Sequence, residues 1–174
     1  ICADACADRL IASNPCAGIE TPRKKRKDHT YLTVEQLFRL ADESGERRTM
    51  VLVLGLCGLR WGEMAGLHVA DVDFVRHRLS VRRSATTVGH GVVVDLPKSG
   101  ETRRVVFPGV LDGPLRDQCG GRDGGEPLFP APDGGYLVRT AHPNDRTKWF
   151  WWAKRRAGVP AGLTYHDLRH TAAS

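Results

Sequence analysis

The sequence has no long apolar run. Its most apolar stretch, MVLVLGLCGL at 50–59, spans ten residues, whereas a membrane-spanning helix needs roughly 20. The stretch therefore suits a buried helix. The first segment, ICADACADRLIA, is interrupted by Asp4 and Asp8 and does not read as a signal peptide. From these absences we expect a soluble globular protein with no membrane partner.

Paired cysteines are also absent. The five cysteines are Cys2, Cys6, Cys16, Cys57 and Cys119, and no two of them form a C-x-x-C motif. An odd, scattered set favours reduced thiols over a disulfide framework, so we expect a cytoplasmic location. Cys57 lies within the apolar run and is interpreted as a small core residue.

Acidic residues are fewer than basic ones, and no internal repeat is visible. The 174 residues carry a net charge of +6, and the pI is about 9.3. A chain of this length can bury a core of its own, so we expect one domain with a remnant of a second. The basic balance favours a polyanionic partner, and the placement of the charges matters more than their sum.

Hydrophobic periodicity and capping residues predict a mainly helical chain. Thr33, followed by Gln36, forms a capping-box pattern at a helix start, and Thr164 can cap a last helix with Asp167 in its first turn. The helices are predicted at 1–13, from 33, at about 47–57 and 61–67, near 108–119, at 143–157 and from 164, with a loop at 120–135.

Residues 72–107 change to a period of two. VDFVRHRLSVRR alternates, and GVVVDLP and TRRVVFP alternate on either side of KSGE. This pattern predicts a small antiparallel sheet of about three strands with a tight connection at Lys98–Glu101. The expected fold class is mainly α with a small antiparallel β-sheet (α+β).

A run of cations follows the first helix. TPRKKRKD contains five in succession, which are Arg23, Lys24, Lys25, Arg26 and Lys27. Such a run repels itself and stays extended, so it reads as a linker. It is either a solvated tether or a segment that follows a phosphate backbone.

The stretch HDLRHTAAS at 166–174 places His166, Arg169 and His170 on one helical face. Their i, i+4 spacing would let the two imidazoles hold zinc, but no third ligand has a recognisable spacing and Arg169 would repel a dication. A phosphate suits every group, because a guanidinium binds two oxygens and imidazoles can donate. We interpret this face as a phosphate site and expect no metal.

Two further cations have both a structural and a functional reading. Arg60 lies between a buried helix and a short one, three residues before Glu63, and can form an ion pair with it. Lys98 is expected at a hairpin tip, where lysine serves solubility or delivers a proton to a neighbouring cleft.

These motifs occur together in one known family. G-L-R-x-x-E at 58–63, P-K-S-G-x-T-R-R-V at 97–105 and H-D-L-R-H-T at 166–171, after YLTVEQL at 31–37, resemble the tyrosine recombinases, or phage-type integrases. The resemblance covers nearly the whole chain. It implies a catalytic domain at 30–174 that is incomplete at its C-terminal end, a basic linker at 21–29, and at 1–20 the last helix of a preceding core-binding domain.

The resemblance implies a chemistry without metal or other cofactor. In the family, a tyrosine attacks a DNA phosphate and forms a 3′-phosphotyrosyl link that a second strand resolves. Arg60 and Arg169 would clamp the phosphate oxygens, and Lys98 would protonate the leaving oxygen. His166 would assist proton transfer, His170 would make a supporting contact, and Glu63 would orient an arginine.

The resemblance also implies a nucleophilic tyrosine after the H-x-x-R box. All three tyrosines of this chain, Tyr31, Tyr136 and Tyr165, precede that box or abut it. We therefore expect a recombinase fragment that binds DNA without cleaving it. The alternatives are a non-catalytic DNA-binding module derived from a recombinase, a type IB topoisomerase-like enzyme and, on the zinc reading, a metallohydrolase using His166 and His170.

The expected partner is double-stranded DNA, bound by a homo-tetramer in the complete protein and by a monomer in the fragment. Further arginines on the predicted strands either contact the DNA backbone or form a solvated face, and they are Arg82, Arg83, Arg103 and Arg104. WFWW at 149–152 is interpreted mainly as core, while basic residues of the same helix could face DNA, namely Lys148, Lys154, Arg155 and Arg156.

Overall fold

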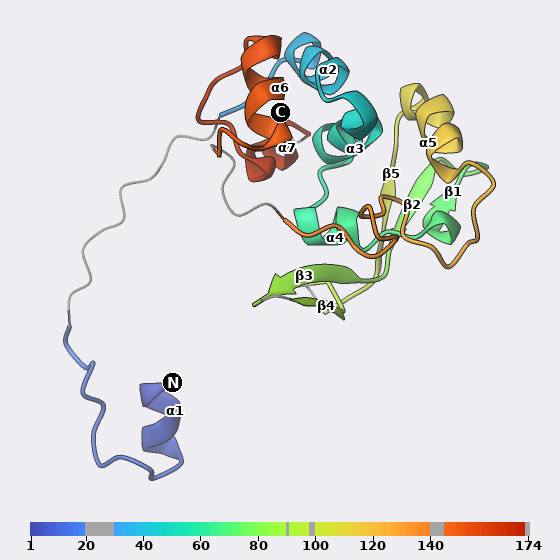
Figure 1. The fold of residues 1–174 in the computed structure, drawn as a ribbon. Helices are drawn as coiled ribbons and strands as arrows, with labels where there is room; N and C mark the ends of the chain where they lie inside the picture. The colour runs from blue at the N-terminus through green and yellow to red at the C-terminus, as the bar shows by residue number, and fades with distance from the viewer. Residues whose placement is uncertain (20–29, 90, 98–99, 140–144, 173–174) are drawn as a thin grey trace.

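The fold combines a helical half with two small antiparallel sheets (Figure 1). The structure is a computed structural model that describes residues 1–19, 30–89, 91–97, 100–139 and 145–172. The expected α+β class is confirmed. No helix in these ranges is long and apolar enough to span a membrane.

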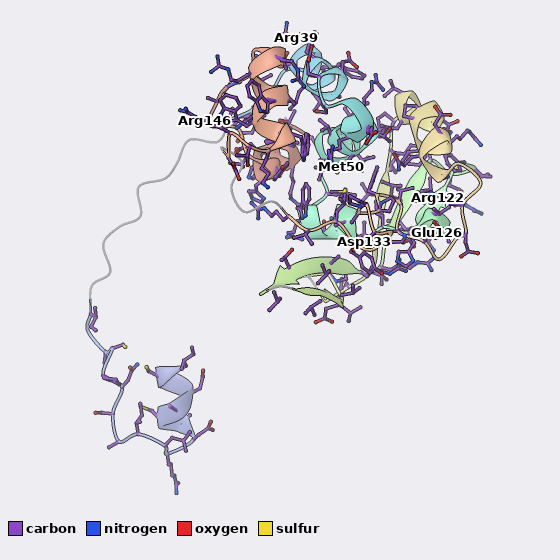
Figure 2. The ribbon with its side chains drawn as sticks, viewed as in Figure 1. Arg39, Met50, Arg122, Glu126, Asp133 and Arg146 are labelled. Carbon is purple, nitrogen blue, oxygen red and sulfur yellow. The ribbon has the colours of Figure 1, made fainter. Side chains whose placement is uncertain are left out.

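The helical half consists of α2 (Val34–Asp42), α3 (Arg48–Cys57), α6 (Trp149–Ala157) and α7 (Tyr165–Thr171). At the start of α2, the Thr33 hydroxyl accepts from the Gln36 N–H and the Gln36 side chain accepts from the Thr33 N–H, as the capping-box pattern predicts. α3 follows the short 3₁₀ helix η1 (Gly45–Arg47) and is buried on almost every side. Met50 is labelled in the interior in Figure 2, with Arg39 and Arg146 at the surface.

The last two helices differ in how well their starts were predicted. Thr164 caps α7 through Asp167 as expected. The prediction that α6 starts near 143 is wrong within the described residues, because α6 begins at Trp149. The Asp145 carboxylate accepts hydrogen bonds from both the N–H and the hydroxyl of Thr147, which closes a turn in place of a helical one.

Five strands form two separate sheets. β1 (Val72–Asp73), β2 (Arg78–Val81) and β5 (Arg103–Val106) form one sheet in the order β1-β2-β5, and β3 (Ser84–Val88) pairs with β4 (Gly91–Asp95) in the other. The expected hairpin around 98–101 is therefore wrong. Of the strands that flank it, β4 pairs with β3 just before it and β5 pairs with the more distant β2, a choice of partner that local alternation does not identify.

Short elements connect the two halves. α4 (Trp61–Ala65) and η2 (Val69–Asp71) lead into the sheets, and η3 (Gly109–Leu111) leads into α5 (Asp112–Cys119). The segment 120–139 contains neither helix nor strand, as predicted for 120–135. One apolar core joins the halves, with Leu54 of α3, Leu79 of β2, Phe107 and Phe150 all buried in it.

At the N-terminal end, α1 (Cys2–Ala7) is shorter than the helix expected at 1–13 and contains no buried residue. The basic linker Arg23–Lys27 and Lys98 lie outside the described residues. Cys57 is buried, as predicted for a small core residue, and burial raises the pKa of its thiol to about 12.

Candidate functional site

The candidate site is built on a buried carboxylate at the start of α4. Glu63 is 1% exposed, and its Oε2 accepts the backbone N–H of Arg60, the N-cap residue, at 2.8 Å. Its Oε1 accepts from Nη1 of Arg60 at 2.9 Å. The ion pair predicted from the spacing of Arg60 and Glu63 is thus present, and it fixes the guanidinium while leaving the Arg60 side chain 40% exposed.

Arg103 is the member of this cluster that sequence reasoning missed. It was expected to contact DNA or to lie on a solvated face, but its two Nη atoms donate to the two carboxylate oxygens of Glu63, at 2.6 and 2.8 Å. The fork geometry of a guanidinium matches a carboxylate in this way. The signal was the alternation along β5, which places Arg103 on the inward side with Val105 and Phe107, and Arg104 outside.

Arg169 reaches the same carboxylate from α7. Its Nη1 donates to the carbonyl of Gly58 at 2.9 Å and lies 3.7 Å from Oε2 of Glu63. Gly58 ends α3 with a φ of +62°, and a Cβ there would lie 3.2 Å from that of Ala172, so the C-terminal end of α7 packs on this turn. The motif around Arg60 and the motif around Arg169 therefore meet in space.

The cluster has an excess of positive charge. Three guanidinium groups share one carboxylate, which leaves two positive charges unbalanced. Burial alone would raise the pKa of Glu63, but the hydrogen bonds from Arg103 and Arg60 outweigh it and lower the pKa to about 2. Burial and the nearby Arg60 lower the pKa of Arg169, as expected where cations crowd together. Such a site attracts an anion.

A cavity of about 360 Å³ opens beside this cluster. Arg60 and His166 both line it, and the His166 side chain is exposed at its edge. Arg169 is not among the lining residues, and it is linked to the lining residue Arg60 through Glu63, which lies within 3.7 Å of both guanidinium groups. The volume falls within the range of small-ligand pockets, which starts at roughly 300 Å³.

His170 lies beside His166 on α7. The two rings meet edge to face with centroids 4.6 Å apart, and the ring of Tyr31 lies 6.4 Å from that of His170. Within the described part of the chain, no third His, Cys, Asp or Glu joins the two histidines to complete a metal-ligand group. The arrangement gives the zinc reading no additional support.

Two of the remaining strand arginines pair with a different carboxylate. Arg82 and Arg83 lie 3.4 and 3.0 Å from the buried carboxylate of Asp71, and Arg83 also donates to the carbonyl of Gly66. They hold β2 and β3 to the turn after α4. Arg104 is exposed and lines a second cavity, of about 400 Å³, together with Arg82 and Arg103.

The aromatic run in α6 is only partly core, so the prediction for WFWW is wrong for Trp152. Phe150 is 1% exposed, whereas Trp152 is 50% exposed. The suggestion that Lys154 faces DNA is also wrong. Lys154 is 1% exposed, and its Nζ donates to the carbonyls of Ala161 and Leu163, at 2.6 and 3.0 Å. It therefore ties α6 to the segment that leads into α7.

The chain is similar to known proteins over nearly its whole length. It is 32% identical to the integrase of Mycobacterium phage L5 over 175 residues, which cover 96% of this chain and 46% of that protein. It is 27% identical to the tyrosine recombinase XerC of Vibrio vulnificus, with 95% of this chain and 50% of the relative covered. The chain thus spans about half the length of these curated relatives. No protein-family model matches it.

Solved structures share the fold. The Tn1549 transposon integrase in complex with a circular intermediate DNA superimposes with a TM-score of 0.74 at 19% identity, over 98% of this chain and 60% of that one. The XerA recombinase superimposes with a TM-score of 0.59 at 25% identity, over 87% and 51%.

Proposed function

The chain belongs to the tyrosine recombinases, the family of the phage integrases, and on that premise we propose that its cationic cluster binds a phosphate of double-stranded DNA. The observation that carries the proposal is the convergence of Arg60, Arg103 and Arg169 on the single carboxylate of Glu63 beside an open cavity. The cluster pre-orients its guanidinium groups and keeps an excess of positive charge.

Each side chain has a distinct role in this proposal. Arg60 and Arg169 bind the non-bridging oxygens and stabilise the negative charge that grows during phosphoryl transfer. His166, at the edge of the same cavity, donates a hydrogen bond to the phosphate and assists proton transfer, and His170 supports its ring. Glu63 and Arg103 do not touch the phosphate and hold the two clamping arginines in place.

The complete protein, on this proposal, is a site-specific recombinase or integrase. Residues 30–174 form the greater part of its catalytic domain, residues 1–20 the last helix of a core-binding domain, and 21–29 a linker along the DNA. Lys98 is proposed as the general acid and Arg104 as a backbone contact. The complete protein works as a tetramer on DNA, in a prokaryotic cytoplasm.

The proposal is tested by DNA binding at several salt concentrations. Fluorescence anisotropy of a labelled duplex gives the slope of log affinity against log salt, which becomes shallower by about 0.9 for each phosphate contact that is lost. Arg60→Ala and Arg169→Ala are expected to lower affinity at least fivefold and to keep the fold by circular dichroism. Arg76→Ala removes an equally charged but 70% exposed side chain and serves as the control.

Equal losses in all three variants would contradict a phosphate clamp at Glu63 and would leave only a diffuse charge effect.

The three tyrosines of this chain are poorly suited to act as nucleophile. Tyr165 is 2% exposed and packs on Phe150 with ring centroids 4.3 Å apart, and the Tyr136 hydroxyl bonds to His68 at 2.8 Å. Tyr31 is 54% exposed, and its ring lies 6.4 Å from that of His170. We propose that residues 1–174 bind DNA without forming a covalent link.

A nicked duplex incubated with the 174-residue chain tests this proposal on a denaturing gel. No shifted protein–DNA band is expected. A band that disappears in Tyr31→Phe would contradict the proposal and identify Tyr31 as the attacking residue.

A further inference from the structure

The cavity beside α4 contains a cation that the proposed clamp does not use. Arg139 lines it together with Arg60 and His166. Its side chain is exposed, and none of the ion pairs between described residues involves it. By contrast, Arg60 is neutralised in part by Glu63. Arg139 thus brings a full positive charge into the cavity.

The segment that carries Arg139 is anchored shortly before it. Oη of Tyr136 lies 2.8 Å from Nε2 of His68, and the two rings stack with centroids 5.8 Å apart. Tyr136 also forms a β-bridge with Pro130. Figure 1 shows this segment passing along α4. The anchor directs Arg139 to the cavity and limits the freedom that binding would have to remove.

Hydroxyl groups of β3 complete the lining. Ser84, Thr86 and Thr87 line the same cavity, with the Ser84 and Thr86 side chains on the face of β3 toward α4, and no Asp or Glu is among the lining residues. β3 lies close against α4, since a Cβ on Gly62 would come within 2.5 Å of the Ser84 Oγ. Hydroxyls and guanidinium groups donate to phosphate oxygens, so this composition suits an anion.

We propose that Arg139, with the Thr86 hydroxyl, binds a second phosphate of the DNA strand, adjacent to the one that Arg60 binds. This inference rests on the proposed function. The first phosphate already has Arg60, Arg169 and His166 as donors, and the cavity of about 360 Å³ that Arg60 and His166 line is also lined by residues of β3 and by Arg139. Arg139 therefore fixes the register of the strand and leaves the chemistry to the clamp.

Binding of two small nucleotides distinguishes the two proposed phosphate subsites experimentally. Thymidine 3′-monophosphate carries one phosphate, and thymidine 3′,5′-bisphosphate carries two on one sugar. Isothermal titration calorimetry at matched ionic strength is expected to show that Arg139→Ala lowers affinity for the bisphosphate about tenfold or more and leaves the monophosphate unchanged. Thr86→Val is expected to lower bisphosphate affinity about threefold, and Arg76→Ala is expected to change neither affinity.

Two results would overturn the second subsite. One is an equal loss for both nucleotides in Arg139→Ala, which would place Arg139 on the first phosphate. The other is a loss no larger than in Arg76→Ala. The proposed clamp fails separately, if Arg60→Ala leaves binding of the monophosphate unchanged.

Discussion

Glu63 is the residue through which two motifs, more than a hundred positions apart, become one site. Its carboxylate accepts from Arg60 and Arg103 and lies 3.7 Å from Arg169. The i, i+3 spacing made the first of these pairs predictable from the sequence. The contribution of Arg103 was not, because it depends on the sheet that carries β5 alongside α4.

We expect Glu63→Gln to lower the free energy of unfolding by about 3 kcal/mol in urea denaturation. The amide keeps the shape of the side chain but leaves the surrounding guanidinium groups without a counter-charge. Glu43→Gln is the matched control, because its partner Arg156 is exposed, and a change within about 1 kcal/mol is expected there. Similar effects in the two variants would show that the buried carboxylate does not organise the cluster.

The lowered pKa of Glu63 predicts that the folded chain loses stability at acid pH. The pKa of Glu63 is about 2 in the folded chain and 4.5 in the unfolded chain. The contribution of Glu63 to stability is therefore fully present above pH 4.5 and is lost as the pH falls toward 2. Between those values the wild type is expected to lose more stability than Glu63→Gln. Parallel curves for the two proteins in urea denaturation would refute the assignment.

Lys154 predicts a change of the opposite kind at alkaline pH. Burial lowers its pKa to about 8, against 10.5 when unpaired in water, and the nearby Asp167 only partly opposes this. The folded state therefore releases the proton first, and stability rises with pH between about 8 and 10.5. Relative to Lys154→Met, the wild type is expected to gain thermal stability over this range, and the exposed Lys148→Met serves as control. A constant difference would contradict burial of the charge.

Helix starts were the elements that the sequence predicted best, and strand pairing was the least predictable. Thr33 and Thr164 cap α2 and α7 through partners three residues away, so the signal is local. The start of α6 was misplaced because Asp145 closes a turn with Thr147, an equally local alternative. The partner of β5 is β2, whose residues lie between 22 (Val81 and Arg103) and 28 (Arg78 and Val106) positions away, and no nearby residue specifies this pairing, whereas β4 pairs with β3 just before it.

The contact between α4 and β3 offers a test of element packing. A Cβ on Gly62 would lie 2.5 Å from the Ser84 Oγ and 3.0 Å from the Ala85 carbonyl, so Gly62→Ala is expected to cost about 1–3 kcal/mol in urea denaturation. Gly113→Ala in α5 has open space around it and is expected to stabilise slightly. If Gly62→Ala were as stable as the wild type, β3 would not be held against α4.

The positive charge of the molecule is unevenly distributed. Many arginines are paired with carboxylates at the surface, as Arg48 is with Asp42 and Arg156 with Glu43, whereas the cluster around Glu63 and the neighbouring Arg139 keep an excess of positive charge. A net charge of +6 alone would bind DNA diffusely. A cavity lined by aligned hydrogen-bond donors predicts that, besides this diffuse binding, one phosphate is held at a defined position.

The most direct measurement is a titration with inorganic phosphate followed by the NMR signals of the arginine Nε–H groups. We predict that the signals of Arg60 and Arg169 shift together and saturate with a single affinity, while those of Arg76 and Arg116 remain in place. Shifts of equal size in all four, or none at Arg60 and Arg169 when DNA still binds, would contradict a phosphate site built on Glu63.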